Sequence, residues 1–108
     1  YGALVCDRAG IPMEVFAEQL PVTMGVLPSY YRYFAETVPA RRFDDPPASM
    51  FTYMAALDDA VKTFEENGAP DQLPRLFRDI ARAGVEAGHG DQALTAVVPL
   101  ILKGDIPA

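Results

Sequence analysis

Apolar residues recur at intervals of three and four through residues 50–67 of this 108-residue chain. That spacing places them along one face of an α-helix, with the charged residues of the segment on the opposite face. Ser49 is predicted to be the N-cap, because its side-chain oxygen can accept a backbone N–H of the first turn. The apolar face comprises Met50, Tyr53, Met54, Leu57, Val61 and Phe64. The pattern therefore predicts that residues 48–67 hold the longest helix of the chain.

Two further amphipathic segments follow that helix. Residues 71–88 are predicted to form a helix capped by Asp71, and residues 91–102 a last helix capped by Asp91. Pro99 is expected to bend or shorten the last helix, because proline removes one helical hydrogen bond. Charged side chains on the first of these helices have the spacing that favours pairing within the helix. They are Arg75, Asp79, Arg82 and Glu86.

Prolines divide the first half of the chain. Pro12 and Pro21 each predict a helix start, since the first turn does not need the N–H that proline lacks. Pro28 predicts a kink or break near Leu27. Residues 39–47 are predicted to be a Pro-rich acidic loop. No segment alternates with the period of a β-strand, so the fold class is predicted to be all-α, with five to six helices.

Residues 1–9 have the pattern of a helix that has an end but no beginning. Gly10 is a typical C-terminal stop, whereas no capping residue precedes Tyr1. We therefore expect residues 1–9 to be the tail of an interdomain helix severed from a larger protein, and residues 1–108 to be a single helical C-terminal domain. A short first helix on a processed domain is the alternative.

Composition narrows the possible classes of function. Half of the chain is hydrophobic and 22% is charged, which fits one folded domain. The net charge of −6 opposes binding to nucleic acid or to an anionic membrane. The apolar runs are shorter than the roughly 20 residues of a membrane span. Cys6 is the only cysteine and cannot form an internal disulfide, which suits a reducing compartment and predicts a cytoplasmic protein.

Few residues offer candidate chemistry, and no metal-ligand spacing is present. His89, the only histidine, lies between two glycines, and we favour a structural role or a contact with a second subunit over a proton donor. Of Tyr30, Tyr31, Tyr33 and Phe34, two are expected to face one pocket. Tyr53 lies on the apolar face of its helix, where we favour core packing, and a role as general acid is the alternative. Because no glycine-rich phosphate loop is present, the chain alone is not expected to bind a dinucleotide.

The order of several short motifs resembles that of one enzyme family. The motifs are Leu20-Pro21, Leu27-Pro28, the helix ending Glu65-Glu66-Asn67-Gly68, and the turn Ala87-Gly-His-Gly-Asp91. Together they are similar to the C-terminal helical domain of imine reductases and reductive aminases. These enzymes are NADPH-dependent oxidoreductases related to the 6-phosphogluconate and β-hydroxyacid dehydrogenases. The resemblance covers essentially the whole chain, and the Ala-Gly-His-Gly-Asp turn is its most specific part.

This resemblance implies an enzyme of which the chain is one part. Family members carry an N-terminal Rossmann domain, which binds most of the NADPH, and form a homodimer through intertwined helices. The implied reaction is hydride transfer to the C=N or C=O bond of a small-molecule imine or carbonyl substrate. The proton donor is expected upstream of this chain, so no catalytic residue is assigned, and the fragment alone is not expected to be active.

The resemblance also implies four substrate-lining residues, which are Thr23, Val26, Thr52 and Tyr53. Val26 stands where the family often has a bulky aromatic residue, and the smaller side chain is expected to open that wall of the pocket. A hypothesis from a different class is a stand-alone, non-catalytic all-α module that binds another protein.

Overall fold

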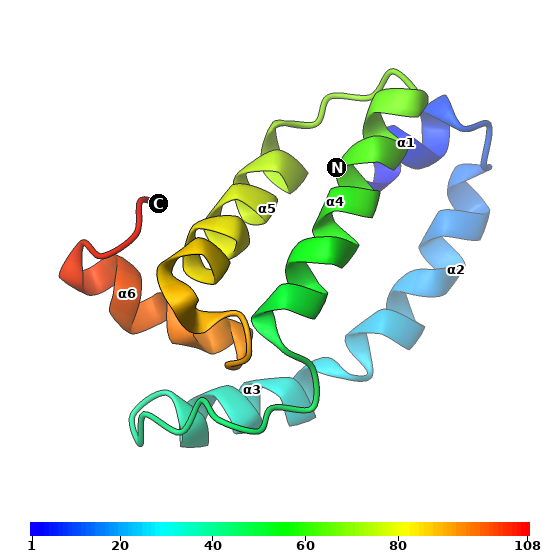
Figure 1. Cartoon of the computed structure of the whole chain (residues 1–108). Helices are drawn as coiled ribbons and strands as arrows, with labels where there is room; N and C mark the ends of the chain where they lie inside the picture. The colour runs from blue at the N-terminus through cyan, green and yellow to red at the C-terminus, as the bar shows by residue number, and fades with distance from the viewer.

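The computed structural model describes all 108 residues, and its regular structure is helical throughout (Figure 1). The helices are α1 Gly2–Arg8, α2 Met13–Met24, α3 Leu27–Thr37, α4 Met50–Glu66, α5 Gln72–Gly84 and α6 Val97–Lys103. A π-helical turn, Val85–His89, and a 3-10 turn, Leu94–Ala96, lie between α5 and α6. None of the helices has both the length and the hydropathy that a membrane crossing requires. The all-α prediction is confirmed.

Helices α4 and α5 lie side by side and form the packed centre of the domain (Figure 1). α4 buries the face that the apolar spacing predicted, with Met50, Val61 and Phe64 removed from solvent. Its first turn is capped as expected, because the Oγ of Ser49 accepts the backbone N–H of Thr52 at 3.2 Å. The longest helix therefore begins where the sequence predicts.

The arginines of α5 bind carboxylates of α4. Arg82 contacts the carboxylate of Asp58 at 2.9 Å, and Arg75 contacts that of Glu65 at 2.7 Å. The predicted pairing of both arginines with carboxylates four residues later in their own helix is therefore wrong. The side chain of Asp58 is only 29% exposed between the two helices, where an arginine from α5 is the nearest counter-charge.

One predicted helix cap lacks its hydrogen bond, and another is wrong. Asp71 occupies the cap position of α5, but its carboxylate binds the guanidinium of Arg75 instead of a backbone N–H. Asp91 is exposed, and Ala93 takes the cap position of the 3-10 turn. Pro99 is the third residue of α6, where no helical partner exists for an N–H, so the helix continues past it.

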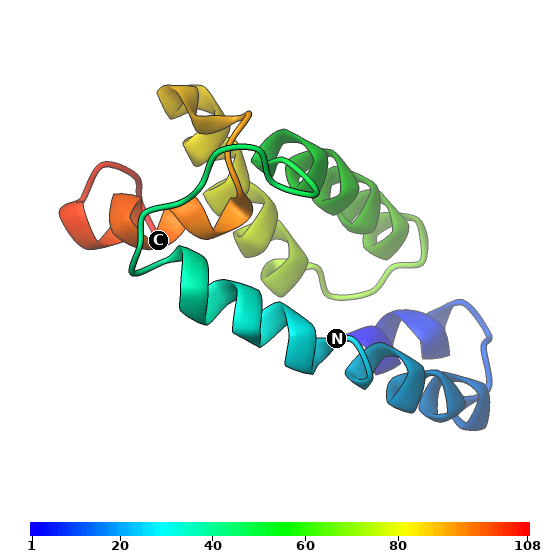
Figure 2. The same ribbon diagram turned by 90° about the horizontal axis from the view of Figure 1, so that it is seen from below.

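Helices α1, α2 and α3 form an arm along one side of the α4–α5 pair, with α2 and α3 nearly end to end (Figure 2). Pro21 lies inside α2, so the predicted helix start at that residue is wrong. The carbonyl that loses its partner belongs to Ala17 on the exposed surface, where water can bind it. The break predicted near Leu27 is present: α2 ends at Met24, and Pro28 lies in the first turn of α3.

Candidate functional site

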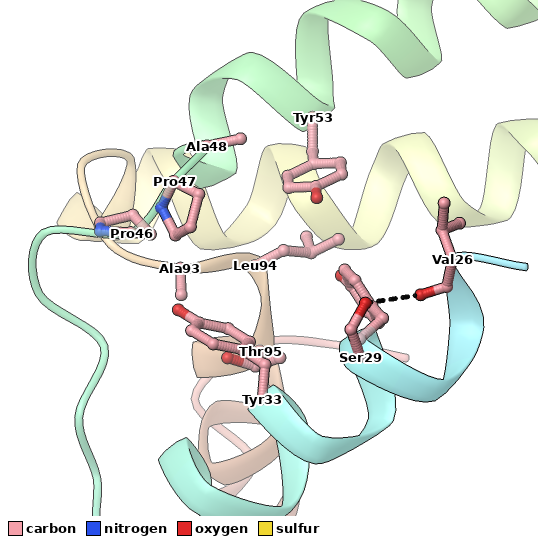
Figure 3. Close-up of a pocket in the computed structure, with 11 residues that line it drawn as sticks. Val26, Ser29, Tyr33, Pro46, Pro47, Ala48, Tyr53, Ala93, Leu94 and Thr95 are labelled. Atoms are coloured by element: carbon pink, nitrogen blue, oxygen red, sulfur yellow. Dashed lines mark hydrogen bonds between the residues drawn. The ribbon is translucent and has the colours of Figure 1, made fainter.

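A pocket of about 310 Å³ lies where α3 meets the first turn of α4 (Figure 3). Its other walls come from the loop before α4 and from the segment before α6. Seven of its eleven lining residues are hydrophobic, and none carries a charge at neutral pH. The lining residues are Val26, Ser29, Tyr30, Tyr33, Pro46, Pro47, Ala48, Tyr53, Ala93, Leu94 and Thr95.

The glycine-rich turn that follows α5 holds the start of α4 in place. The backbone N–H of Phe51 donates to the carbonyl of Gly90 at 3.0 Å, and that of Met50 donates to the carbonyl of Gln92 at 2.7 Å. These bonds satisfy N–H groups that the first turn of a helix cannot satisfy internally. They also fix the turn of α4 that carries Tyr53 into the pocket (Figure 3).

His89 makes its contact within this turn and does not line the pocket. Gly88 before it has a φ of 95°, the left-handed conformation that glycine adopts without steric cost. The Nδ1 of His89 lies 2.9 Å from the Oε1 of Gln92. The histidine thus links two residues of the turn, a structural contact of the kind that the sequence favoured.

The proline-rich loop predicted for residues 39–47 is free of helix and supplies the opposite wall. Within it, the carbonyl of the buried Phe43 accepts the backbone N–H of Ala93 at 2.8 Å. Ser49 and Ala93 also form the isolated antiparallel bridge of the structure. Backbone hydrogen bonds therefore join two pocket walls that are distant in sequence.

The structure brings together two of the four residues implied to line the substrate. Val26 and Tyr53 both line the pocket. Thr23 lies on the exposed surface of α2, outside it. Thr52 is also outside, with its Oγ1 3.1 Å from the Oγ of Ser49. Substrate contact by any of the four stays a prediction.

Two of the four aromatic residues between positions 30 and 34 line the pocket, as the helical spacing predicted. Tyr30 and Tyr33, three residues apart, share the face of α3 that points to the pocket. Tyr31 is 64% exposed, and Phe34 does not line the pocket either. With Tyr53 from α4, the pocket contains three phenols.

These phenols are uncharged hydrogen-bonding groups. Burial, and then the neighbouring phenols of Tyr53 and Tyr33, raise the pKa of Tyr30 to about 12. The fold therefore favours the protonated phenol, which ionises only as the pH rises through about 12, and Tyr30 is a hydrogen-bond donor at neutral pH. Ser29 differs, because its hydroxyl already donates to the carbonyl of Val26 at 3.0 Å (Figure 3).

Thr95 is a pocket residue that sequence reasoning missed. It is 5% exposed, and its hydroxyl has no hydrogen-bond partner. The sequence offered no signal for it, because Leu94 and Val97 are three residues apart and a polar residue between two such positions is ordinary for an amphipathic helix. The lining residues Pro46, Pro47, Ala48 and Ala93 gave no signal either, because nothing in their spacing points to a shared site.

The pocket does not fit the phosphates of a dinucleotide. Proteins bind such phosphates with cationic side chains or with the N–H groups of a glycine-rich helix start. The lining offers no cationic side chain, and neither of its loops opens a helix with a glycine-rich sequence. A ligand in this pocket would be held by apolar contacts and by uncharged hydrogen bonds.

Solved structures from several organisms share this fold. An imine reductase from Pseudomonas sp. has a TM-score of 0.85 at 18% identity, over 93% of this chain and 35% of its own. The imine reductase BcSIRED from Bacillus cereus BAG3X2 has a TM-score of 0.85 at 21% identity, over 92% of this chain and 35% of its own. A reductive aminase from Aspergillus terreus, in complex with NADPH4, cyclohexanone and allyl amine, has a TM-score of 0.83 at 14% identity, over 93% of this chain and 36% of its own. This chain thus spans about a third of each relative's length.

The sequence itself matches one family across almost its entire length. Residues 2–103 match the family described as NADPH-dependent reductive aminase-like, C-terminal domain. No curated protein matches the sequence. The family match confirms the resemblance that the two Leu-Pro pairs and the Gly-His-Gly turn carry. The chain therefore belongs to the NADPH-dependent reductive aminase-like family and corresponds to its C-terminal domain.

Proposed function

We propose that this chain is the dimerising, substrate-lining C-terminal domain of an NADPH-dependent imine reductase-like oxidoreductase, which transfers hydride to a C=N or C=O bond. The observation that carries the proposal is the uncharged pocket, whose walls combine apolar side chains with three phenols. NADPH supplies the hydride in such an enzyme. A Rossmann domain would hold its phosphates, because this pocket has no cation for them. The match to an enzyme family favours this proposal over a stand-alone interaction module.

Val26 and Tyr53 are the residues to which the proposal gives substrate contact. Val26 is smaller than the aromatic residue often found there, which leaves room for the body of a substrate. Tyr53 lies at the start of α4 and is partly buried, so its hydroxyl can donate to a polar atom in the pocket. The proposal includes a cytoplasmic location, which fits the single cysteine, Cys6, and which fractionation of cells tests.

Tyr53→Phe is expected to lower kcat/KM about tenfold or more, because it removes a hydrogen-bond donor from the substrate site. The assay is NADPH oxidation by the enzyme that contains this domain and its nucleotide-binding domain. Its substrates are a cyclic imine, and cyclohexanone with allyl amine. Tyr31→Phe is the matched control, since that phenol is 64% exposed and outside the pocket.

Two results would count against the proposal, and they differ in meaning. If Tyr53→Phe and Tyr31→Phe both retain the wild-type kcat/KM, Tyr53 does not contact the substrate. If NADPH is oxidised with neither the imine nor the ketone and amine, the proposed reaction is wrong.

The surface of the chain supports the dimer in this proposal. It exposes 7016 Å², whereas a compact monomer of 11.7 kDa exposes about 5,900 Å². Its radius of gyration is 15.5 Å, against about 13 Å for a compact domain of this length. The excess of roughly 1,100 Å² per chain is the amount that a stable dimer buries. In the proposed dimer, part of this surface is buried at an apolar groove of about 400 Å³ between α4, α5 and α6.

Sedimentation equilibrium is expected to give twice the 11.7 kDa mass of the chain. Phe77→Glu places a charge in the apolar groove and should shift the protein to monomer, because a buried, unpaired carboxylate is unfavourable. Phe51→Glu is the control, since Phe51 is 55% exposed and lies outside the groove. A monomeric wild type would contradict the dimer, and dissociation by both variants would contradict the choice of the groove.

A further inference from the structure

A second pocket, of about 320 Å³, is lined by the proline-rich loop before α4, the turn after α5, and the segment that runs into α6. It shares no lining residue with the pocket beside α3. Only two kinds of side chain line it, buried apolar ones and basic ones. The apolar residues are Phe43, Ala96, Pro99 and Leu100, and the basic ones are Arg41, His89 and Lys103. The pocket therefore has an apolar floor and no acidic group.

Two of these basic residues are cations that the fold leaves without a counter-charge. Lys62 of α4 and all three arginines of α5 pair with carboxylates, whereas Arg41 and Lys103 form no ion pair. Carboxylates are plentiful in this chain, which has 15 acidic residues against 9 Lys and Arg. Two unpaired cations on one pocket run against that composition, and such an arrangement favours an anion as the ligand.

Arg41 stands where the backbone would favour glycine. Its φ of 55° is in the left-handed region. Its backbone N–H donates to the carbonyl of Val38 at 3.2 Å, and the next N–H donates to the carbonyl of Thr37 at 3.0 Å. These are the hydrogen bonds of a helix end whose left-handed residue is usually glycine, because a side chain is unfavourable there. The turn that closes α3 therefore holds the arginine in place without needing its side chain.

Helix α6 brings Lys103 to the same floor. Ala96, Pro99, Leu100 and Lys103 follow one another at intervals of three and four, so they share one face of the last helical segment. The apolar groove proposed for the dimer takes Val97 and Ile101 from this segment instead. The pocket and the groove thus lie on different faces of α6.

We propose that this pocket binds a small organic oxyanion, a carboxylate or a phosphate ester, with an apolar body. Arg41 can give two parallel hydrogen bonds to either head group, and Lys103 adds a second positive charge. Both side chains are exposed, so a ligand can reach their charged ends from solvent. The apolar body packs on Phe43 and Leu100. The inference goes beyond the proposed function, because hydride transfer does not involve this pocket.

Titration calorimetry with four probes tests the ligand class. The protein is the enzyme that contains this domain, saturated with NADP+ so that the phosphate sites of its nucleotide-binding domain are filled. Benzoate and phenyl phosphate carry a ring and a charged head, benzyl alcohol carries the ring alone, and inorganic phosphate the head alone. The tighter of the two ring anions should have a Kd at least tenfold below those of benzyl alcohol and inorganic phosphate, and it identifies the head group. A Kd for benzyl alcohol or inorganic phosphate as low as that of the ring anion would overturn the proposal.

Three variants test the location of the site. Arg41→Gly and Lys103→Met should each weaken binding of that ring anion about tenfold, the equivalent of one charge-assisted hydrogen bond, and leave benzyl alcohol unchanged. Arg42→Gly is the matched control, since it removes one positive charge from the same loop at a residue outside the pocket. A wild-type Kd in both Arg41→Gly and Lys103→Met would overturn the proposal. Equal weakening by Arg41→Gly and Arg42→Gly would also overturn it, because the effect would then come from surface charge in general.

Thermal unfolding separates a ligand site from a structural role of the arginine. Arg41→Gly should raise the Tm of the ligand-free protein, because glycine adopts the left-handed conformation without strain. Arg42→Gly should lower it, since the φ of Arg42 is not positive and glycine there only adds freedom to the unfolded chain. The ring anion should raise the Tm of the wild type and of Arg42→Gly but not that of Arg41→Gly. A lower Tm in Arg41→Gly than in Arg42→Gly would show that the fold itself needs the arginine side chain, and would overturn the proposal.

Discussion

Met50→Ala is expected to lower the free energy of unfolding by about 2–5 kcal/mol. Met50 is fully buried and packs in a cluster with Phe43, Ala93 and Ala96. Truncation would leave a cavity that these neighbours cannot fill, so that both the transfer free energy and the packing contacts of the side chain are lost. Urea unfolding should show a lower midpoint at an unchanged m-value.

Met54 offers the matched control for this substitution. It is a methionine one turn later in α4 and is only partly buried, so Met54→Ala should cost less than Met50→Ala. Met50→Leu nearly conserves volume and should cost under about 1.5 kcal/mol. Equal losses for the two alanine variants would contradict the central place of Met50 in the core. The expected loss is large for a domain whose total stability is about 5–15 kcal/mol.

Gly84→Val is expected to destabilise the domain by about 1–3 kcal/mol or more, although valine has the better helix propensity. A Cβ on Gly84 would overlap the Sδ of Met50 and lie 3.3 Å from its Cε. Met50 has no exposed surface toward which it could move, so α5 would have to shift away from α4. Thermal unfolding should show the loss as a decrease of roughly 4–8 °C in Tm per kcal/mol.

A double-mutant cycle tests whether Gly84 and Met50 act on each other. Gly84→Ala in the wild type adds a methyl group where the thioether already lies, whereas in Met50→Ala the same methyl group enters a cavity. We therefore expect the change in the free energy of unfolding caused by Gly84→Ala to be more favourable in Met50→Ala than in the wild type, by about 1–3 kcal/mol. Gly90→Ala is the control, because an added Cβ there makes only ordinary contacts, the shortest at 3.5 Å. Strict additivity of Gly84→Ala and Met50→Ala would contradict the close packing.

Sequence patterns predicted the parts of the fold that local geometry determines. The cap at Ser49 and the break before Pro28 depend on atoms within one helical turn, and both are present. Predictions failed where a group finds its partner elsewhere in the fold. Arg82 binds Asp58 on the adjacent helix. The last helical segment begins after Asp91 because the intervening backbone is hydrogen-bonded to α4 and to the loop before it.

The same distinction applies to the pocket. Helical spacing placed two of four neighbouring aromatic residues on one side of α3, and the resemblance pointed to Val26 and Tyr53, which line the pocket. Thr95 could not be found in this way. Its companions on the wall come from the loop before α4, and the hydrogen bonds that join these segments are made by main-chain atoms. Such bonds leave side-chain patterns unchanged.

The hydrogen bonds from Met50 to Gln92 and from Ala93 to Phe43 have a consequence for how this domain can evolve. Every residue except proline offers the same main-chain N–H and C=O groups. Side chains nearby, such as those of Ala48 and Leu94, can therefore change in size and polarity while the hydrogen-bonded backbone segments that carry them keep their position. Selectivity can then diverge among relatives through point substitutions, with no need for insertions, deletions or a rearranged backbone.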